Sequence, residues 1–326
     1  MHFYLIGIDY KTTPIDARDV IYRNRKLILK FWESAYAERA EAIVTCNRIE
    51  IYGVSQNAQE AEKALNGFYE SAPDFSKHAH VKHGRQDVFR HALRVASGLE
   101  SQLRGETEIL AQIKRWRSGH YGHPSLKSLW DEVILFAENI RLRYGLNYQS
   151  DNIATVVFED LAKRLPSNET AKILVIGTGK IAELIAKHRQ TAFHITFVAH
   201  KNRDKAEALA RESGGDALLL SNLTQAIPAV FAVISATSSP HHILKRGHFS
   251  NALNSRSVPL YLYDLAVPRD IEPSVGGIDG IFLQNLDDLG KIFEKYNERR
   301  QKSVDAASKA IEEIISRQKE NVYASH

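Results

Sequence analysis

A short apolar strand that runs directly into a glycine turn constrains the fold of this chain more than any other segment. The strand covers residues 172–176, and the helical pattern that follows opens with Gly177-Thr178-Gly179-Lys180-Ile181-Ala182. The first glycine permits the tight turn, the second lets the backbone approach a pyrophosphate, and the helix N-terminus supplies oriented N–H groups. Strand, turn and helix in this order predict a dinucleotide site; a tight turn without a ligand is the alternative.

Strand-like and helical segments alternate on the C-terminal side of the glycine turn. The next strand-like runs are Ile195–Val198, Val230–Ile234 and Leu260–Asp264, with helical patterns or loops between them. Such alternation is typical of a parallel sheet whose strands are joined by crossover helices. We therefore predict an α/β domain over residues 151–285, built on a doubly wound sheet.

The end of the second strand of this domain predicts which dinucleotide binds. An acidic side chain at that place accepts hydrogen bonds from the ribose 2′-hydroxyl of NAD. This chain has Lys201, Asn202 and Arg203 there, and the first acid is Asp204. Cationic donors suit a 2′-phosphate, which favours NADP(H); a basic loop that only contacts solvent is the alternative.

The first 150 residues mix strands and helices and predict a separate α+β domain. Strands are expected at Phe3–Asp9, Ala42–Thr45 and Ile49–Val54, and helices at Arg23–Ala37 and Gln59–Glu70. From residue 86 to residue 148 the pattern is helical, with a break near Gly119 and Pro124. Apolar residues keep helical spacing again after Asp287, which predicts a helix to the end of the chain.

Composition excludes several classes of protein. The single cysteine excludes an internal disulfide and a cysteine-based zinc site, and it suits a reducing cytosol. The longest apolar stretch, Ala226–Thr237, is about a dozen residues and contains Pro228, whereas a membrane span needs roughly 20. A net charge of +4 does not by itself indicate a nucleic-acid partner. We expect a cytoplasmic protein with neither a membrane segment nor a metal site.

The cysteine lies in the run Thr45-Cys46-Asn47-Arg48, between two predicted strands. An arginine beside a cysteine can lower the pKa of the thiol, and the thiolate is the nucleophilic form. A buried cysteine that acts only as a small apolar residue is the alternative.

The order and spacing of further motifs resemble the glutamyl-tRNA reductase family along nearly the whole chain. The matching segments are Gly7–Pro14, Thr45–Glu50, His91–Ser101, Gly105–Gln112, Asp264–Asp270 and Asn285–Leu289. The resemblance implies an N-terminal α+β catalytic domain over 1–150, a Rossmann-like NADP-binding domain over 151–285 and a long C-terminal helix over 286–326.

The resemblance also implies an activity. Cys46 would attack the ester that joins glutamate to tRNA, and NADPH would reduce the resulting thioester to glutamate-1-semialdehyde, the first step of tetrapyrrole synthesis. His91 matches a family histidine and is expected to transfer a proton near the leaving oxygen. On charge grounds Arg48 would hold a substrate carboxylate and Glu106 an α-ammonium group. The residues that match the family's glutamyl pocket, or replace its residues, are Thr45, Asn47, Arg48, Ser101, Glu106, Thr107, Glu108 and Gln112.

The chain departs from the family pattern in its sequence and its length. Thr107 stands where the family has proline, and Glu108 where it has glutamine, so affinity for the glutamyl group is expected to change. Family members usually continue with a helical dimerisation domain, so we do not expect their usual dimer here. The apolar stripe from Val304 to Ile315 must then fold back on the chain or pair with a second copy.

Two other readings remain open at this point. One is a paralogue that acts on another aminoacyl-tRNA or a carrier-bound acyl group. The other is a non-catalytic regulator that binds NADPH, tRNA or haem, although such a protein has no need of the thiol. Glutamyl-tRNA is the expected partner, with the downstream aminomutase as a further candidate. The basic groups Lys114–Arg117 and Arg141–Arg143 are compatible with RNA binding or with a solvated helix face.

Overall fold

The computed structural model describes residues 1–36, 39–118, 122–148, 152–166, 169–188, 191–249 and 258–324, with side chains to 318. The chain divides into two compact units. The first comprises residues 1–149 and 293–326, and the second comprises residues 150–292. The C-terminal segment therefore belongs to the same unit as the N-terminal residues.

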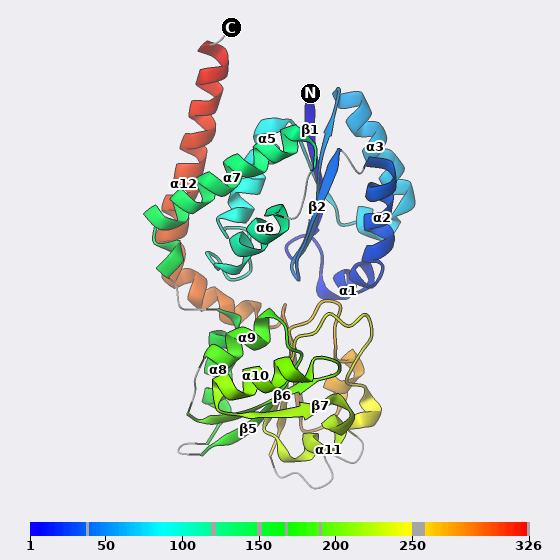
Figure 1. Ribbon diagram of the computed structural model, residues 1–326, viewed down its shortest axis with the longest axis vertical. Helices are drawn as coiled ribbons and strands as arrows, with labels where there is room; N and C mark the ends of the chain where they lie inside the picture. Colours follow the sequence, from blue (N-terminus) through cyan, green and yellow to red (C-terminus); the bar gives the residue numbers. More distant parts are fainter. Residues whose placement is uncertain are drawn as a thin grey trace. The chain divides into compact units, whose positions relative to one another are not determined.

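An antiparallel sheet forms the centre of the first unit (Figure 1). Its strands lie in the order β2-β3-β1-β4. They are β1 (His2–Asp9), β2 (Ala40–Val44), β3 (Arg48–Ser55) and β4 (His80–His83). The register pairs Asp9 with Arg48 and Ile8 with Ile49, so β1 ends beside the β2–β3 turn that carries Cys46.

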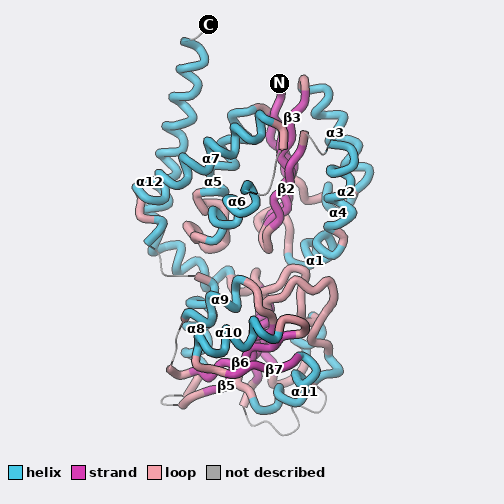
Figure 2. The backbone as a smooth tube through the Cα atoms, viewed as in Figure 1, coloured by secondary structure: helices cyan, strands magenta, loops and turns pink. Residues whose placement is uncertain are grey.

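Helices cover both faces of this sheet (Figure 2). One face packs on α1 (Ile15–Arg23), α2 (Arg25–Tyr36), α3 (Ala58–Ser71) and α4 (Pro73–Ser76) through an aromatic cluster that includes Tyr4, Trp32 and Phe68. The other face packs on α5 (Arg85–Ala96), α6 (Glu108–Ser118) and α7 (Pro124–Arg143). Because side chains alternate along β1, they contribute to the apolar packing on both faces of the sheet.

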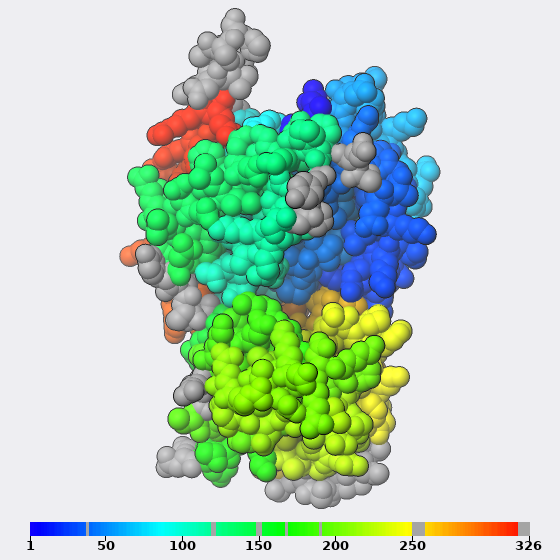
Figure 3. Space-filling model, viewed as in Figure 1, coloured from blue at the N-terminus to red at the C-terminus, as the bar shows by residue number. Residues whose placement is uncertain are grey.

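The C-terminal helix α12 (Gly290–Ala324) packs on the first unit. Val304, Ala307, Ile311 and Ile315 are buried in the same apolar cluster as residues of α5 and α7. In Figure 3 the red surface of α12 lies against the green surface of α7. Of the alternatives for the apolar stripe, the structure shows the folded-back one, in which the stripe is covered by the chain's own helices.

The second unit is a six-stranded parallel sheet in the order β10-β9-β8-β5-β6-β7. Its strands are β5 (Ala171–Ile176), β6 (Phe193–Ala199), β7 (Asp216–Leu219), β8 (Ala232–Ser235), β9 (Leu260–Asp264) and β10 (Ile281–Asn285). The helices that cover it include α8 (Ile153–Arg164), α9 (Lys180–Lys187), α10 (Arg203–Ser213) and α11 (Leu223–Ala226). The strand order reverses between β5 and β8, which is where doubly wound folds bind their ligands. The predicted α/β class, the parallel sheet and the long C-terminal helix are confirmed.

The structure differs from the predicted elements in a few places. The helix expected over 23–37 is α2, which begins at Arg25, and the helix before it, α1, which starts directly after Pro14, was not predicted. Ala37 and Gly119 lie outside the described residues. Three short strands, β4, β7 and β10, were not predicted. Helix α5 ends at Ala96 because Gly98 has a φ of +79°, so a loop over residues 97–107 interrupts the helical pattern that was predicted from residue 86 onward.

Candidate active site

Cys46 lies at the tip of the turn between β2 and β3, and several hydrogen bonds fix that turn. The Thr45 amide donates to the Arg48 carbonyl at 2.9 Å and closes the turn. The Tyr22 hydroxyl donates to the Thr45 carbonyl at 2.7 Å, and the Tyr10 amide donates to the Asn47 carbonyl at 3.0 Å. The side chain of Cys46 itself is exposed. The chain thus presents a thiol to solvent on a backbone that is held in place.

The surroundings of Cys46 disfavour the thiolate, contrary to the expectation that Arg48 lowers its pKa. Desolvation, and then the carboxylate of Glu106, raise the pKa of the thiol to about 11. Arg18 and Arg48 oppose this shift but do not cancel it. The thiol is therefore mainly protonated at neutral pH.

Arg48 and Glu50 form a buried ion pair just behind the cysteine turn. Their side chains are 1% and 0% exposed, and Arg48 Nη1 donates to Glu50 Oε1 at 2.7 Å. Arg48 Nη2 donates to the Glu100 carbonyl at 2.5 Å, so the guanidinium also ties β3 to the loop after α5. Arg48 thus directs both of these hydrogen bonds at partners inside the protein, Glu50 and the Glu100 carbonyl.

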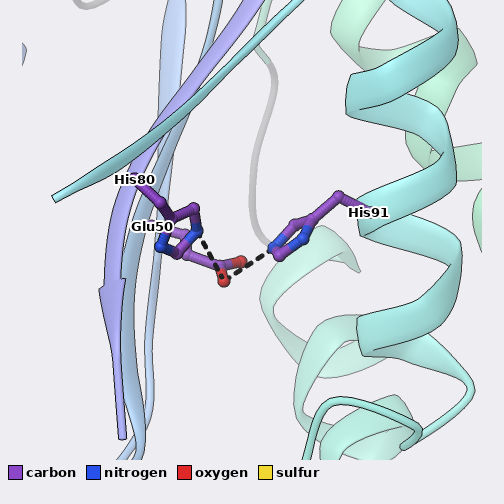
Figure 4. Close-up of side chains that lie close together, drawn as sticks. All are labelled: Glu50, His80 and His91. Atoms are coloured by element: carbon purple, nitrogen blue, oxygen red, sulfur yellow. Dashed lines mark hydrogen bonds and ion pairs between the residues drawn. The ribbon is translucent and has the colours of Figure 1, made fainter. Parts of the chain in front are cut away.

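Glu50 also holds His91, which projects from α5 towards β3 (Figure 4). His91 Nε2 lies 2.9 Å from Glu50 Oε1, and His80 Nε2 lies 4.0 Å from the same oxygen. Burial alone would raise the pKa of Glu50, but His91 and Arg48 hold it well below its usual range. Because the carboxylate is ionised and only accepts, His91 Nε2 is the donor in this hydrogen bond.

Glu50, His80 and His91 are close enough to face one metal ion. However, Glu50 Oε1 already accepts from Arg48 and His91, and Oε2 accepts from the Tyr52 hydroxyl at 2.8 Å. A guanidinium on the same oxygen opposes a second cation. This donor set fits a hydrogen-bonded anchor for His91 better than a metal site.

The loop of residues 97–107, between α5 and α6, carries further predicted pocket residues. Ser101 is buried, Glu106 is half-buried and Thr107 is exposed, while Glu108 and Gln112 follow on α6. Desolvation, with Glu108 adding to it, raises the pKa of Glu106 to about 7, and a hydrogen bond from Ser101 opposes the shift. Glu106 therefore changes charge close to neutral pH.

The side chain of Arg141, on α7, holds this loop in place from below the surface. Its assignment to an RNA-compatible basic group is therefore wrong. Its side chain is buried and donates to the carbonyls of Ser97 (2.8 Å) and Gly105 (3.1 Å). Lys114 of the other basic group forms an ion pair with Glu138 on α7. A buried arginine with backbone partners cannot contribute to a surface for RNA.

In the second unit, the glycine turn has the geometry that the sequence predicts. Gly177 has a φ of +109°, and a Cβ there would lie 2.6 Å from the Ala236 carbonyl oxygen, so only glycine fits. Gly179 is the N-cap of α9 and has no side chain with which to cap the first amides of that helix. This turn and helix start form a cradle that suits a pyrophosphate, and its remaining residues are Thr178, Lys180, Ile181 and Ala182.

Asp270, a buried acid at the end of the Asp264–Asp270 motif, fixes the loop opposite the glycine turn, a role that the sequence analysis did not predict. Asp270 accepts from the Thr237 amide at 2.8 Å, from its hydroxyl at 2.6 Å and from the Ser235 hydroxyl at 2.8 Å. Asp264 accepts from the Ile271 amide at 2.8 Å and so holds the segment that carries Asp270. These bonds keep the Ala236 carbonyl against Gly177.

The residues predicted to choose the cofactor lie where β6 leads into α10. Asn202 is the N-cap of α10, and Lys201 and Asn202 are exposed. Arg203 Nε donates to Glu207 at 2.8 Å in an exposed ion pair along α10. The three side chains are together at one edge of the sheet, although Arg203 already has an acidic neighbour.

Comparison with known proteins places this chain in a family. The family model "Glutamyl-tRNAGlu reductase, N-terminal domain" matches residues 6–144, and "Shikimate / quinate 5-dehydrogenase" matches residues 159–292. A glutamyl-tRNA reductase of Marinobacter nauticus is 32% identical over 336 residues, covering 97% of this chain and 76% of that protein. The chain belongs to the glutamyl-tRNA reductase family.

Other members of the family give similar values. The glutamyl-tRNA reductase of Chromohalobacter salexigens is 32% identical over 328 residues, covering 94% of this chain and 75% of that protein. The solved glutamyl-tRNA reductase of Methanopyrus kandleri is 28% identical and covers 98% of this chain and 80% of that one, with a TM-score of 0.49.

Family membership identifies the chain as an oxidoreductase with a pyridine nucleotide cofactor, because its second unit has the dehydrogenase type of nucleotide domain. In the part of the chain that the structure describes, no helix is both long and apolar enough to cross a bilayer. Sequence reasoning missed Arg18, which donates to Asn47 Oδ1 at 3.4 Å, and the anchoring roles of Arg141 and Asp270. A histidine at residue 80, on a short strand, gave no sequence signal.

Proposed function

We propose that this chain reduces glutamyl-tRNA to glutamate-1-semialdehyde with NADPH, through a thioester on Cys46, as the first step of tetrapyrrole synthesis. The observation that carries the proposal is an exposed thiol on a fixed turn in a member of the glutamyl-tRNA reductase family. A regulator that only binds NADPH, tRNA or haem would have no use for that thiol.

The covalent step follows from the groups around Cys46. The sulfur attacks the carbonyl carbon of the glutamyl ester, the carbon–oxygen bond to the tRNA breaks, and a glutamyl thioester remains on the protein. The leaving 3′-oxygen takes up a proton, and His91, held by Glu50, is the proposed donor. The raised pKa of Cys46 means that the thiol must lose its proton on the way to attack, and this proton balances the one that the leaving 3′-oxygen takes up.

The glutamyl group is proposed to lie among residues of the cysteine turn and the loop after α5. Ser101 steadies Glu106, and a carboxylate there complements the α-ammonium group of the substrate. Thr107 and Glu108, which replace the family's proline and glutamine, are proposed to change the affinity of the pocket for the glutamyl group. The proposed pocket residues are Thr45, Asn47, Arg48, Ser101, Glu106, Thr107, Glu108 and Gln112.

The cofactor is proposed to be NADPH, which supplies the hydride when it is bound. The turn of residues 177–182 would hold the pyrophosphate, and Lys201, Asn202 and Arg203 would hold the 2′-phosphate. Domain limits of 1–150, 151–285 and 286–326, a cytoplasmic location and the aminomutase as a partner complete the proposal.

One assay tests the reaction and the cofactor together. Semialdehyde formation from glutamyl-tRNA is measured with NADPH and with NADH, for the wild type and for Lys201→Gln/Arg203→Gln. NADPH is expected to be the better reductant, and the double variant to lose about 1.5–3 kcal/mol of NADPH binding per charged hydrogen bond removed, but little of NADH binding. Binding of tRNA and NADPH without turnover would instead identify a regulator, and turnover only with another aminoacyl-tRNA would identify a paralogue.

A further inference from the structure

Helix α12 makes direct polar contacts with the backbone of the loop that carries the proposed glutamyl pocket. Asn297 Oδ1 accepts from the Arg104 amide at 2.8 Å, and Asn297 Nδ2 donates to the Gln102 carbonyl at 2.9 Å. Arg300 Nη1 donates to the Arg104 carbonyl at 2.7 Å. Two side chains of the C-terminal helix thus hold the backbone at Gln102 and Arg104, directly after Ser101.

The same loop is held at its two ends by Arg141. Its guanidinium bridges the carbonyls of Ser97 and Gly105, and Gly98 packs so closely that a Cβ would lie 3.0 Å from Arg141 Nη1. Arg141 therefore closes the loop, whereas Asn297 and Arg300 fix its middle. Without the hydrogen bonds of Asn297 and Arg300, the peptide groups of Gln102 and Arg104 would lose their partners on α12.

The position of α12 is itself determined by apolar packing. Val304, Ala307, Ile311 and Ile315 are buried against α5 and α7, about two to five turns beyond Asn297 along the same helix. A helix is stiff over this length, so packing of the stripe places Asn297 and Arg300 at the loop. The apolar contact and the polar contact are two parts of one interaction.

We propose that Asn297 and Arg300 are positioning residues, through which α12 sets the conformation of the loop that binds the substrate's glutamyl group. The identity of that group rests on the proposed function. Removal of either side chain frees the loop backbone without touching Cys46, Glu50 or His91, so it acts on substrate affinity rather than on the covalent step.

The test compares variants of the full chain. Asn297→Ala removes both bonds of one side chain, Arg300→Ala removes the other, and Arg300→Lys keeps a donor for the Arg104 carbonyl. Gln86→Ala is the matched control, because Gln86 Nε2 donates to the Ile315 carbonyl at 3.3 Å and so joins α12 to α5 without touching the loop. Amide hydrogen exchange over residues 98–106 and the KM and kcat for glutamyl-tRNA are measured for each.

In Asn297→Ala and Arg300→Ala we expect loop exchange to rise about 3- to 10-fold and KM to rise by a similar factor, with kcat within about twofold of the wild type. Arg300→Lys recovers most of both losses, and Gln86→Ala changes neither. Exchange or KM that stays at the value of Gln86→Ala would overturn the proposal. If the wild type does not turn over glutamyl-tRNA, the proposed function fails, and the exchange measurement alone decides whether α12 holds the loop.

Discussion

The two units of this chain build their candidate sites from different parts of the polypeptide. In the second unit the site is mainly backbone: a glycine turn at a φ of +109°, the uncapped start of α9 and the carbonyl of Ala236. In the first unit it is mainly side chains, with Cys46, Glu50 and His91 held by buried charges and by residues from several elements.

The two sites therefore depend on their surroundings in different ways. A backbone site depends on shape, so it is sensitive where a Cβ cannot fit and tolerant elsewhere. A side-chain site depends on charges taken out of water, so it is sensitive to single substitutions and to pH.

The largest effect is expected at Cys46. Cys46→Ser replaces the thiol with a hydroxyl that is far less acidic, so semialdehyde formation should fall by more than about 10³-fold. NADPH affinity, measured by fluorescence titration, should stay at the wild-type value because the nucleotide site belongs to the other unit. Turnover near that of the wild type would rule out covalent catalysis.

The next effect concerns stability. Glu50→Gln leaves Arg48 buried without its anionic partner, so the free energy of unfolding at pH 7 should fall by about 3 kcal/mol. Since the fold lowers the pKa of Glu50, its stabilising contribution is present above the ordinary value of 4.5 and is lost as the pH falls below it. Urea unfolding at pH 7 and pH 4 measures both.

The matched control for that substitution is Glu207→Gln in the exposed pair with Arg203 of the second unit. An exposed pair contributes only about 0.5 kcal/mol, so this variant should unfold almost as the wild type does. Equal losses in the two variants would show that the comparison between the units is mistaken.

A smaller effect is expected at the glycine turn. Gly177→Ala forces a Cβ to within 2.6 Å of the Ala236 carbonyl at an unfavourable φ, with a strain of about 1–3 kcal/mol, so NADPH binding should weaken about tenfold or more. Gly247→Ala, where a Cβ meets no atom within 4 Å, should bind normally. Fluorescence titration of both variants checks this, and equal affinities would contradict the cradle.

The smallest effect is a pH dependence. Because the pKa of Glu106 is raised to about 7, its carboxylate becomes ionised as the pH rises through that value. If the ionised form holds the α-ammonium group, kcat/KM for glutamyl-tRNA should rise about tenfold per pH unit below pH 7 and then level off. Glu106→Gln should lose this limb, and a profile that is unchanged in the variant would exclude the assignment.

The two units also differ in how much of their structure the sequence predicts. The strand, the glycine turn and the helix were recognisable because each requirement lies within a dozen neighbouring residues, and the parallel sheet followed from alternation along the chain. The short edge strands β4, β7 and β10 were missed because runs of four or five residues with polar members carry little periodicity.

The first unit was harder to predict because its contacts join residues far apart in the sequence. Cys46 and Arg48 were found as neighbours, and His91 only through the family resemblance, but nothing in the sequence pairs Glu50 with His91 or Arg104 with Asn297. The direction of the Cys46 pKa was predicted wrongly because the sequence shows the adjacent arginine and hides both the desolvation and Glu106. Arg141 looked like a surface cation because the sequence does not show which side of α7 is buried.

The central claim is that Cys46 carries the glutamyl group. The most direct test mixes the protein with glutamyl-tRNA in the absence of any nicotinamide nucleotide, stops the reaction in acid and locates the bound glutamate by mass spectrometry of peptides. We expect a glutamyl thioester on the peptide that contains Cys46, released by hydroxylamine and absent from Cys46→Ser. A wild-type protein that forms semialdehyde with NADPH, yet never carries glutamate on Cys46, would contradict it.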